Sequence, residues 1–263
     1  MVARAARTAG ALAAAGAVLA GCGQGADQGY SNAPPASPFK VAQAGVPGAP
    51  TGGGSTTGGN AVQVAGSGTL TAFVPRGTPL RSSAGGRVVG TLPTKTPFKS
   101  PQVVTVVGQR GGWLGILTSQ LPNGRVGWIR AGAGRLFRTD WSIDAIVPRR
   151  QLIVRHGSRV VVRTKMAVGR PGHETPAGLF AVTDKLLINR PGSPYACCVL
   201  ALTGHQTKIP QGWGGGDRLA IHSTNDPSSV GQPVSLGCMR IDAGVARRLV
   251  RLVPLGTQVR IVH

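Results

Sequence analysis

Acidic residues, aromatic side chains and long apolar runs are all scarce in this sequence. Among its 263 residues, only eight are Asp or Glu and 4% are aromatic. Outside the N-terminal segment, no run is long and apolar enough to span a membrane. The signatures of helix-turn-helix, zinc-finger and RNA-stacking proteins are also missing, which argues against nucleic-acid binding.

Basic residues are abundant instead and give the chain a formal net charge of +21. Only six of the 29 basic residues are Lys, and the charge is scattered rather than gathered in one arm or helix. A protein with such an excess of positive charge attracts polyanions. Anionic membrane lipids, cell-wall polymers and a genome-wide bias towards Arg each account for it, and we expect no nucleic-acid partner.

The N-terminus has the features of an export signal. Arg4 and Arg7 precede the short apolar run 9–20, which suits a signal peptide better than a spanning helix. The run ends in Leu19-Ala20-Gly21-Cys22, which resembles the lipobox of bacterial lipoproteins. We therefore expect a signal peptide over residues 1–22 and lipidation of Cys22. The protein would be exported and anchored to the outer face of the cytoplasmic membrane, facing the cell wall.

Composition divides the rest of the chain into three parts. Residues 23–66 are rich in Gly, Pro and Ser, which predicts a disordered linker. In residues 67–138, short apolar runs alternate with turn signals, and Asn123-Gly124 indicates a hairpin, so a small antiparallel β-barrel is expected. Residues 139–263 predict a mostly β domain with one or two short helices, one of them between 240 and 253 and capped by Asp242.

Two tryptophans characterise the predicted barrel. Gly112-Trp113-Leu114 and Gly127-Trp128-Ile129 resemble bacterial Src-homology-3-like domains. We interpret Trp113 and Trp128 as core residues of the barrel in preference to a stacking surface for a ligand.

One cysteine has the surroundings of a nucleophile. Cys238 follows Gly237, whose backbone permits a tight turn and close approach of a substrate. His222 lies upstream, and a loop rich in Pro and Gly joins the two, so the His can act as the base that activates the thiol.

The other cysteines after residue 22 are Cys197 and Cys198. They are adjacent and lack metal-ligand spacing, so we interpret them as small buried residues. His205 is expected to be structural.

Several segments together resemble the L,D-transpeptidase family. They are Ile221-His222-Ser223, the run 231–240 that contains Ser-Leu-Gly-Cys-Met-Arg, the segments 169–172 and 175–180, and Pro191 to Tyr195. The resemblance implies a cysteine transpeptidase of peptidoglycan with an L,D-transpeptidase-type β-sandwich after the barrel. One position departs from the family pattern, because Leu236 stands where the family usually has His.

The resemblance also implies roles for individual residues. Cys238 would be the nucleophile, His222 its base, and Ser223 the residue that orients His222. The N–H groups of Gly237 and Cys238 would hold the oxyanion. The substrate-binding residues would be Ser235, Arg240, Tyr195 and Asn225.

The same resemblance implies a reaction without metal or organic cofactor. The thiolate would attack a stem tetrapeptide between its third and fourth residues, release D-Ala, and pass the acyl group to an amine to form a 3→3 cross-link. Carbapenems would acylate the same cysteine, and a monomer is expected. Two alternatives stay open: an L,D-carboxypeptidase that uses water as acceptor, and a catalytically weak wall-binding lipoprotein, which the loss of His at Leu236 would favour.

Overall fold

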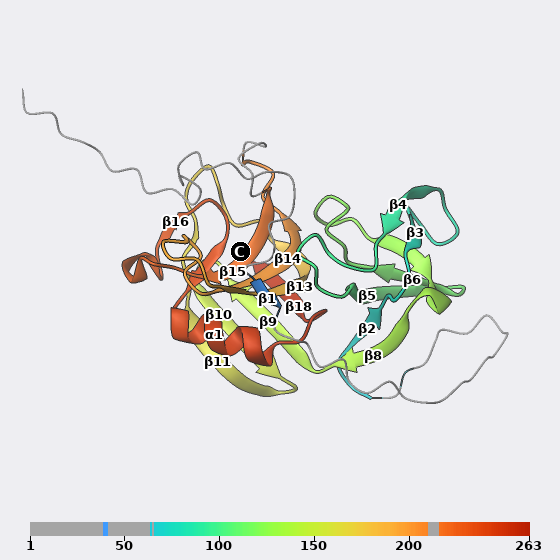
Figure 1. Ribbon diagram of the computed structural model, residues 1–263, viewed down its shortest axis with the longest axis horizontal. Helices are drawn as coiled ribbons and strands as arrows, with labels where there is room; N and C mark the ends of the chain where they lie inside the picture. Colours follow the sequence, from blue (N-terminus) through green and yellow to red (C-terminus); the bar gives the residue numbers. More distant parts are fainter. Residues whose placement is uncertain (1–38, 42–63, 65, 210–215) are drawn as a thin grey trace, which may run out of the picture.

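The computed structural model of the protein describes residues 39–41, 64, 66–209 and 216–263, and two large β-sheets dominate it, one beside the other in Figure 1. The predicted mainly β fold is therefore confirmed. The predicted signal peptide, Cys22 and most of the predicted linker lie outside the described residues. Within the linker range, Phe39–Val41 form strand β1, which pairs with Leu186 to Ile188.

The first sheet has seven antiparallel strands in the order β4-β3-β7-β6-β5-β2-β8. They are β2 (Thr69–Phe73), β3 (Thr78–Arg81), β4 (Val88–Leu92), β5 (Val103–Arg110), β6 (Trp113–Ile116), β7 (Gly127–Arg130) and β8 (Arg135–Thr139). The sequence indicates β3 and β8 only weakly. Pro79 is atypical of a strand interior, and the apolar run of β8 is only two residues long. The predicted Asn123-Gly124 turn lies between β6 and β7, which pair as expected.

The core of this sheet consists of small and aliphatic side chains. Leu80, Leu114, Ile116 and Ile129 are fully buried at its centre. Trp113 and Trp128 are not part of this core, and both are half-buried on the opposite side of their strands. The prediction that they fill the barrel core was therefore wrong, because aliphatic residues one position away in each strand point inward instead.

The second sheet has nine strands in the order β11-β10-β9-β18-β13-β14-β15-β17, with β1 beside β13. They are β9 (Trp141–Ile146), β10 (Gln151–His156), β11 (Arg159–Lys165), β13 (Gly178–Ile188), β14 (Cys198–His205), β15 (Arg218–Ser223), β17 (Met239–Ile241), β18 (Gln258–Val262) and β1. A small two-stranded sheet joins β12 (Val168–Gly169) to β16 (Pro233–Ser235).

The only α-helix among the described residues, α1 (Ala243–Leu252), covers one face of the nine-stranded sheet. It begins where predicted, because the Asp242 carboxylate accepts a hydrogen bond from the Val245 amide at 3.0 Å. Ala246, Leu249 and Val250 are its buried residues. Leu252, the last residue of the helix, is 39% exposed. Two short 3₁₀ turns, Ala131–Ala133 and Pro227–Ser229, complete the structure.

No helix within the described part of the chain is long and apolar enough to cross a membrane.

Candidate active site

One face of the nine-stranded sheet carries the polar residues of the predicted site. β15 and β17 run parallel, and His222 lies opposite Arg240 in their register. Side chains alternate along a strand, so Ala220, His222 and Arg240 share a face, while Ile221 and Met239 point into the core beneath α1. Cys238 immediately precedes β17 and packs against Ala220 on the site face. The fold thus brings Cys238 and His222 to one face of adjacent strands.

The ring of His222 is buried and oriented by the backbone. Its Nδ1 atom lies 2.7 Å from the carbonyl oxygen of Ser223. Because a carbonyl oxygen only accepts, Nδ1 carries the proton and Nε2 presents its lone pair. Nε2 is buried and has no hydrogen-bond partner among the described residues. The Tyr195 ring packs against the imidazole in a T-shaped arrangement, with ring centroids 4.9 Å apart.

The environment of His222 keeps the ring neutral. Burial is the main cause that lowers the pKa of His222 to about 4; the hydrogen bond to Ser223 opposes this shift, and the positive charge of Arg240 adds to it. A neutral imidazole whose Nε2 lone pair is not engaged in a hydrogen bond is the form that accepts a proton from a nucleophile.

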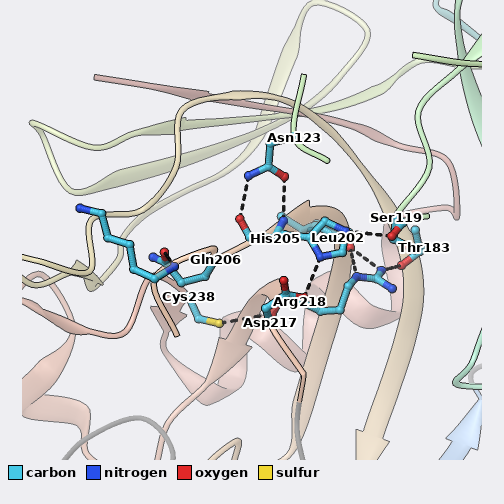
Figure 2. A network of polar contacts seen from close by, with 10 residues as sticks. Ser119, Asn123, Thr183, Leu202, His205, Gln206, Asp217, Arg218 and Cys238 are labelled. Atoms are coloured by element: carbon cyan, nitrogen blue, oxygen red, sulfur yellow. Dashed lines mark hydrogen bonds and ion pairs between the residues drawn. The ribbon is translucent and has the colours of Figure 1, made fainter. Parts of the chain in front are cut away.

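Cys238 occupies the end of a tight turn that Ser235 holds together. The Ser235 hydroxyl donates to the Cys238 carbonyl oxygen at 2.6 Å and accepts from the Gly237 amide at 3.0 Å. Gly237 has φ +118°, a conformation that favours glycine. The Cys238 thiol is half-buried, and its Sγ lies 3.9 Å from the Arg218 carbonyl oxygen (Figure 2).

These contacts alter two of the expected roles. The Gly237 amide, expected to hold an oxyanion, donates instead to Ser235 within the turn. Ser235, expected to bind substrate, is fully buried with its hydroxyl committed to the same turn. Both residues therefore shape the turn that presents Cys238.

Gln206 is a supporting residue that sequence reasoning missed. A side-chain carbon added at Gly237 would lie 2.4 Å from Gln206 Nε2, so the two residues are in close contact. Gln206 is 2% exposed, and its amide donates to the Glu174 carbonyl oxygen at 2.8 Å. A single Gln after a strand carries no sequence signal, because the contact joins residues that are distant in the chain.

Ser223 acts through two different groups. Its carbonyl orients His222, whereas its hydroxyl accepts from the amides of Cys197 and Cys198 at 3.0 and 3.1 Å and donates to the Tyr195 carbonyl oxygen at 2.7 Å. The hydroxyl therefore fixes the segment that carries Tyr195 beside His222. Cys197 and Cys198 are joined to each other in a disulfide, in which Cys238 takes no part.

The other predicted substrate-binding residues lie around this centre. Asn225 is exposed, and its amide donates to the Ser193 carbonyl oxygen at 2.6 Å. Arg240 is 9% exposed, and its backbone pairs with Ala167 in both directions. Leu236, at the departure from the family pattern, is half-buried within the turn. No cluster of metal-ligating side chains occurs in the ranges that the structure describes.

The seven-stranded sheet also reaches the site. Phe98 packs against Leu186, Val199 and Ala220, the same small cluster that Tyr195 and Cys238 contact. The turn that carries Phe98 is attached to β13 by a hydrogen bond from the Thr96 hydroxyl to the buried carboxylate of Asp184.

A second connection between the sheets centres on His205 (Figure 2). The Asn123 amide pairs with the carbonyl and N–H of His205 at 2.7 and 2.8 Å. The two ring nitrogens of His205 lie 2.7 Å from the Asp217 carboxylate and 2.8 Å from the Ser119 carbonyl oxygen. Asp217 adjoins Arg218, whose carbonyl faces the Cys238 thiol, so His205 is a structural link between the seven-stranded sheet and the site.

Comparisons with known proteins identify relatives of the nine-stranded part. Residues 140–261 match the family model of the YkuD L,D-transpeptidase catalytic domain. The YkuD proteins of Bacillus licheniformis and Bacillus subtilis, each named as a candidate L,D-transpeptidase, are 34% and 31% identical over 103 and 121 residues. These matches cover 39% and 46% of this chain, which spans only 54% and 65% of the two relatives.

Solved structures of the same kind are also similar. An L,D-transpeptidase from Mycobacterium smegmatis is 19% identical with a TM-score of 0.37, over 54% of this chain and 76% of that one. L,D-transpeptidase 3 from Mycobacterium tuberculosis, in complex with a faropenem-derived adduct, is 15% identical with a TM-score of 0.40, over 52% and 73% of the two chains.

Proposed function

We propose that this protein is a peptidoglycan L,D-transpeptidase in which Cys238 is the nucleophile and His222 its general base. The match of residues 140–261 to the L,D-transpeptidase catalytic domain supports the reaction class. The observation that carries the proposal is the state of His222: a buried, neutral ring with its proton on Nδ1, on the same sheet face as the Cys238 thiol. A protein that only binds the wall needs neither a thiol nor an oriented base.

In the proposed first step, His222 Nε2 takes the proton of Cys238 Sγ. The thiolate attacks the carbonyl carbon of the third residue of a stem tetrapeptide, and a carbon–sulfur bond forms. The bond to the terminal D-Ala then breaks, and His222 returns the proton to the departing amine. The product is a thioester between Cys238 and the shortened stem, with free D-Ala.

In the second step, the amine of another stem attacks the thioester carbonyl. His222 accepts a proton from this amine, the carbon–sulfur bond breaks, and the thiol of Cys238 is restored. The result is a 3→3 cross-link. Water in place of the amine would give the L,D-carboxypeptidase alternative with the same residues.

Leu236 bears on the choice of acceptor. It is half-buried within the turn that ends at Cys238, where the family pattern has His. An apolar side chain at this position cannot take part in proton transfer, so the attacking amine depends on His222 alone. Slow transfer to the acceptor, with slow deacylation, is the expected consequence.

The cellular setting is part of the same proposal. Export and lipidation at Cys22 would hold the enzyme at the membrane surface, where the linker lets it reach the peptidoglycan.

The test is acylation of the thiol by a carbapenem, whose strained lactam carbonyl is an acyl donor. We expect one covalent adduct by intact mass in a Cys22→Ser chain and none when Cys238→Ala is added. Absence of an adduct in the folded protein would reject the catalytic proposal and favour wall binding. Incubation with a stem tetrapeptide then separates the two reactions: dimeric products identify transpeptidation, whereas tripeptide alone identifies carboxypeptidase activity.

A further inference from the structure

Two tryptophans and three arginines share the outward face of strands β5, β6, β7 and β3. Arg110 lies opposite Trp113 across β5 and β6, and Trp113 lies opposite Arg130 across β6 and β7. Arg81 of β3 lies opposite Trp128 of β7. Directly paired residues of antiparallel strands project to the same side, so these five side chains form one surface, which we call the Trp–Arg face. The aliphatic core lies on the other side of the same strands.

Glycines give the Trp–Arg face a flat centre. Gly108 and Gly115 pair with each other, and Gly115 also pairs with Trp128. A side-chain carbon at Gly115 would lie 3.2 and 3.3 Å from atoms of the Trp128 ring, and one at Gly108 would lie 3.7 Å from it. The indole therefore lies along the backbone of three strands, over positions that have no side chain, instead of turning into the core.

Cation–π contacts orient two of the arginines. The guanidinium carbon of Arg130 lies 4.1 Å from the centroid of the Trp113 ring, and that of Arg81 lies 5.4 Å from it. Arg81 is further held by a hydrogen bond to the Gly86 carbonyl oxygen at 2.7 Å. A guanidinium stacked on an aromatic ring keeps N–H groups at its edge for an oxyanion, and its orientation is fixed before the anion arrives.

The charge of the surrounding sheet is of one sign. Residues 66–139 contain ten Lys and Arg and no Asp or Glu. Each ion pair found among the described residues lies in the nine-stranded part, so none involves the Trp–Arg face. A partner must therefore supply the negative charge.

We infer that the Trp–Arg face is a binding site for an anionic glycan, a polymer of sugar rings that carry carboxylate or phosphate groups. The indole of Trp128 offers an apolar plane for a sugar ring, and Arg81, Arg110 and Arg130 surround it with donors for oxyanions. Single-stranded nucleic acid combines stacking and negative charge as well. We choose a glycan over a nucleic acid because the proposed function, on which this inference rests, has peptidoglycan as its substrate.

The experiment measures binding of the full chain by isothermal titration. The probes are polygalacturonate for carboxylates, phosphomannan for phosphates, dextran as a neutral glycan, and oligothymidine as a nucleic acid. Arg110→Gln with Arg130→Gln removes charge from the face, and Trp128→Ala removes the stacking plane. Arg76→Gln with Arg135→Gln is the matched control, because it removes the same charge from exposed positions outside the face. Thermal unfolding verifies that each variant is folded.

We expect polygalacturonate or phosphomannan to bind, and the polymer that binds more tightly identifies the anionic group. Each face variant should weaken that binding by about tenfold or more, and the control by less than about threefold. If the face variants and the control lose the same binding affinity, net charge alone accounts for binding, and the inference is overturned. Tighter binding of oligothymidine, or equal binding of dextran, would overturn it as well. Carbapenem acylation of Cys238 should be unchanged in these variants, which separates failure here from failure of the proposed function.

Discussion

The Nδ1 atom of His222 lies 2.7 Å from the carbonyl oxygen of Ser223, and this contact fixes which ring nitrogen can accept a proton. Since Nδ1 donates to the carbonyl, Nε2 is the basic atom, and it loses its function only when the ring becomes protonated. Burial lowers the pKa of His222 to about 4, so the base stays competent well into the acid range.

The rate of Cys238 acylation by a carbapenem should therefore keep a His222-dependent plateau down to about pH 5 and fall only as the pH approaches 4. Stopped-flow absorbance of the lactam across the pH range measures this. An acid limb centred near 6.5, the ordinary value for His, would contradict it.

The same pKa shift predicts how stability depends on pH. The unfolded chain protonates His222 near pH 6.5 and the folded chain near pH 4, so the unfolded state binds more protons between these values. The stabilisation by neutral His222 is complete above pH 6.5 and is lost as the pH falls towards 4, by roughly 3 kcal/mol in total. Urea unfolding at several pH values measures this loss of unfolding free energy. In the His222→Gln variant, the loss between pH 6.5 and 4 that is due to His222 should be absent.

Replacement of Gly237 should disrupt the Cys238 turn. Ala at this position would have to adopt φ +118° and would meet Gln206 Nε2 at 2.4 Å. We expect Gly237→Ala to lower the rate of acylation at least about a hundredfold, through loss of the turn geometry. Gly157→Ala is the matched control, because Gly157 also has positive φ but open space around it. Similar losses in the two variants would show that the effect is not specific to the Cys238 turn and would contradict this prediction.

The disulfide between Cys197 and Cys198 predicts a thiol count. In a Cys22→Ser chain, only Cys238 should react with a thiol reagent after denaturation without reductant. Reduction should raise the count from one to three, because the chain has four cysteines in all. Three reactive thiols before reduction would show that the adjacent pair is not oxidised.

The contact between Asn123 and His205 should support both stability and reactivity. Asn123→Ala leaves two backbone groups of His205 without their partners, which we expect to cost about 1–3 kcal/mol of unfolding free energy. Acylation of Cys238 should slow a few-fold, because Arg218 lies in the strand that this link anchors. Gln120→Ala is the control, since Gln120 is exposed and bonds within its own sheet. If Asn123→Ala changes the unfolding free energy and the acylation rate no more than Gln120→Ala does, the proposed link between the two sheets is rejected.

Local patterns were sufficient for much of the fold. The short apolar runs around Val103, Leu152 and Val259 predict strands that the structure contains, and Asp242 predicts the start of the helix. These features depend on neighbouring residues, which is why the sequence carries them. The inward direction of Trp113 and Trp128 was predicted wrongly, because large aromatic residues suit both a core and an exposed sheet face.

The sequence by itself determined the identity of the proposed nucleophile and base, since Cys238 and His222 belong to short motifs with characteristic neighbours. Only the tertiary structure decided how they are held: the tautomer of His222, the use of the Gly237 amide within the turn, the contact with Gln206, and the link through Asn123. The first two depend on the backbone conformation that the fold imposes on His222, Ser223 and the turn 235–238. The contacts of Gln206 and Asn123 depend on pairing between segments that are distant along the chain. No local pattern records such pairing, because a hydrogen bond between remote segments places no requirement on the residues beside it in the sequence.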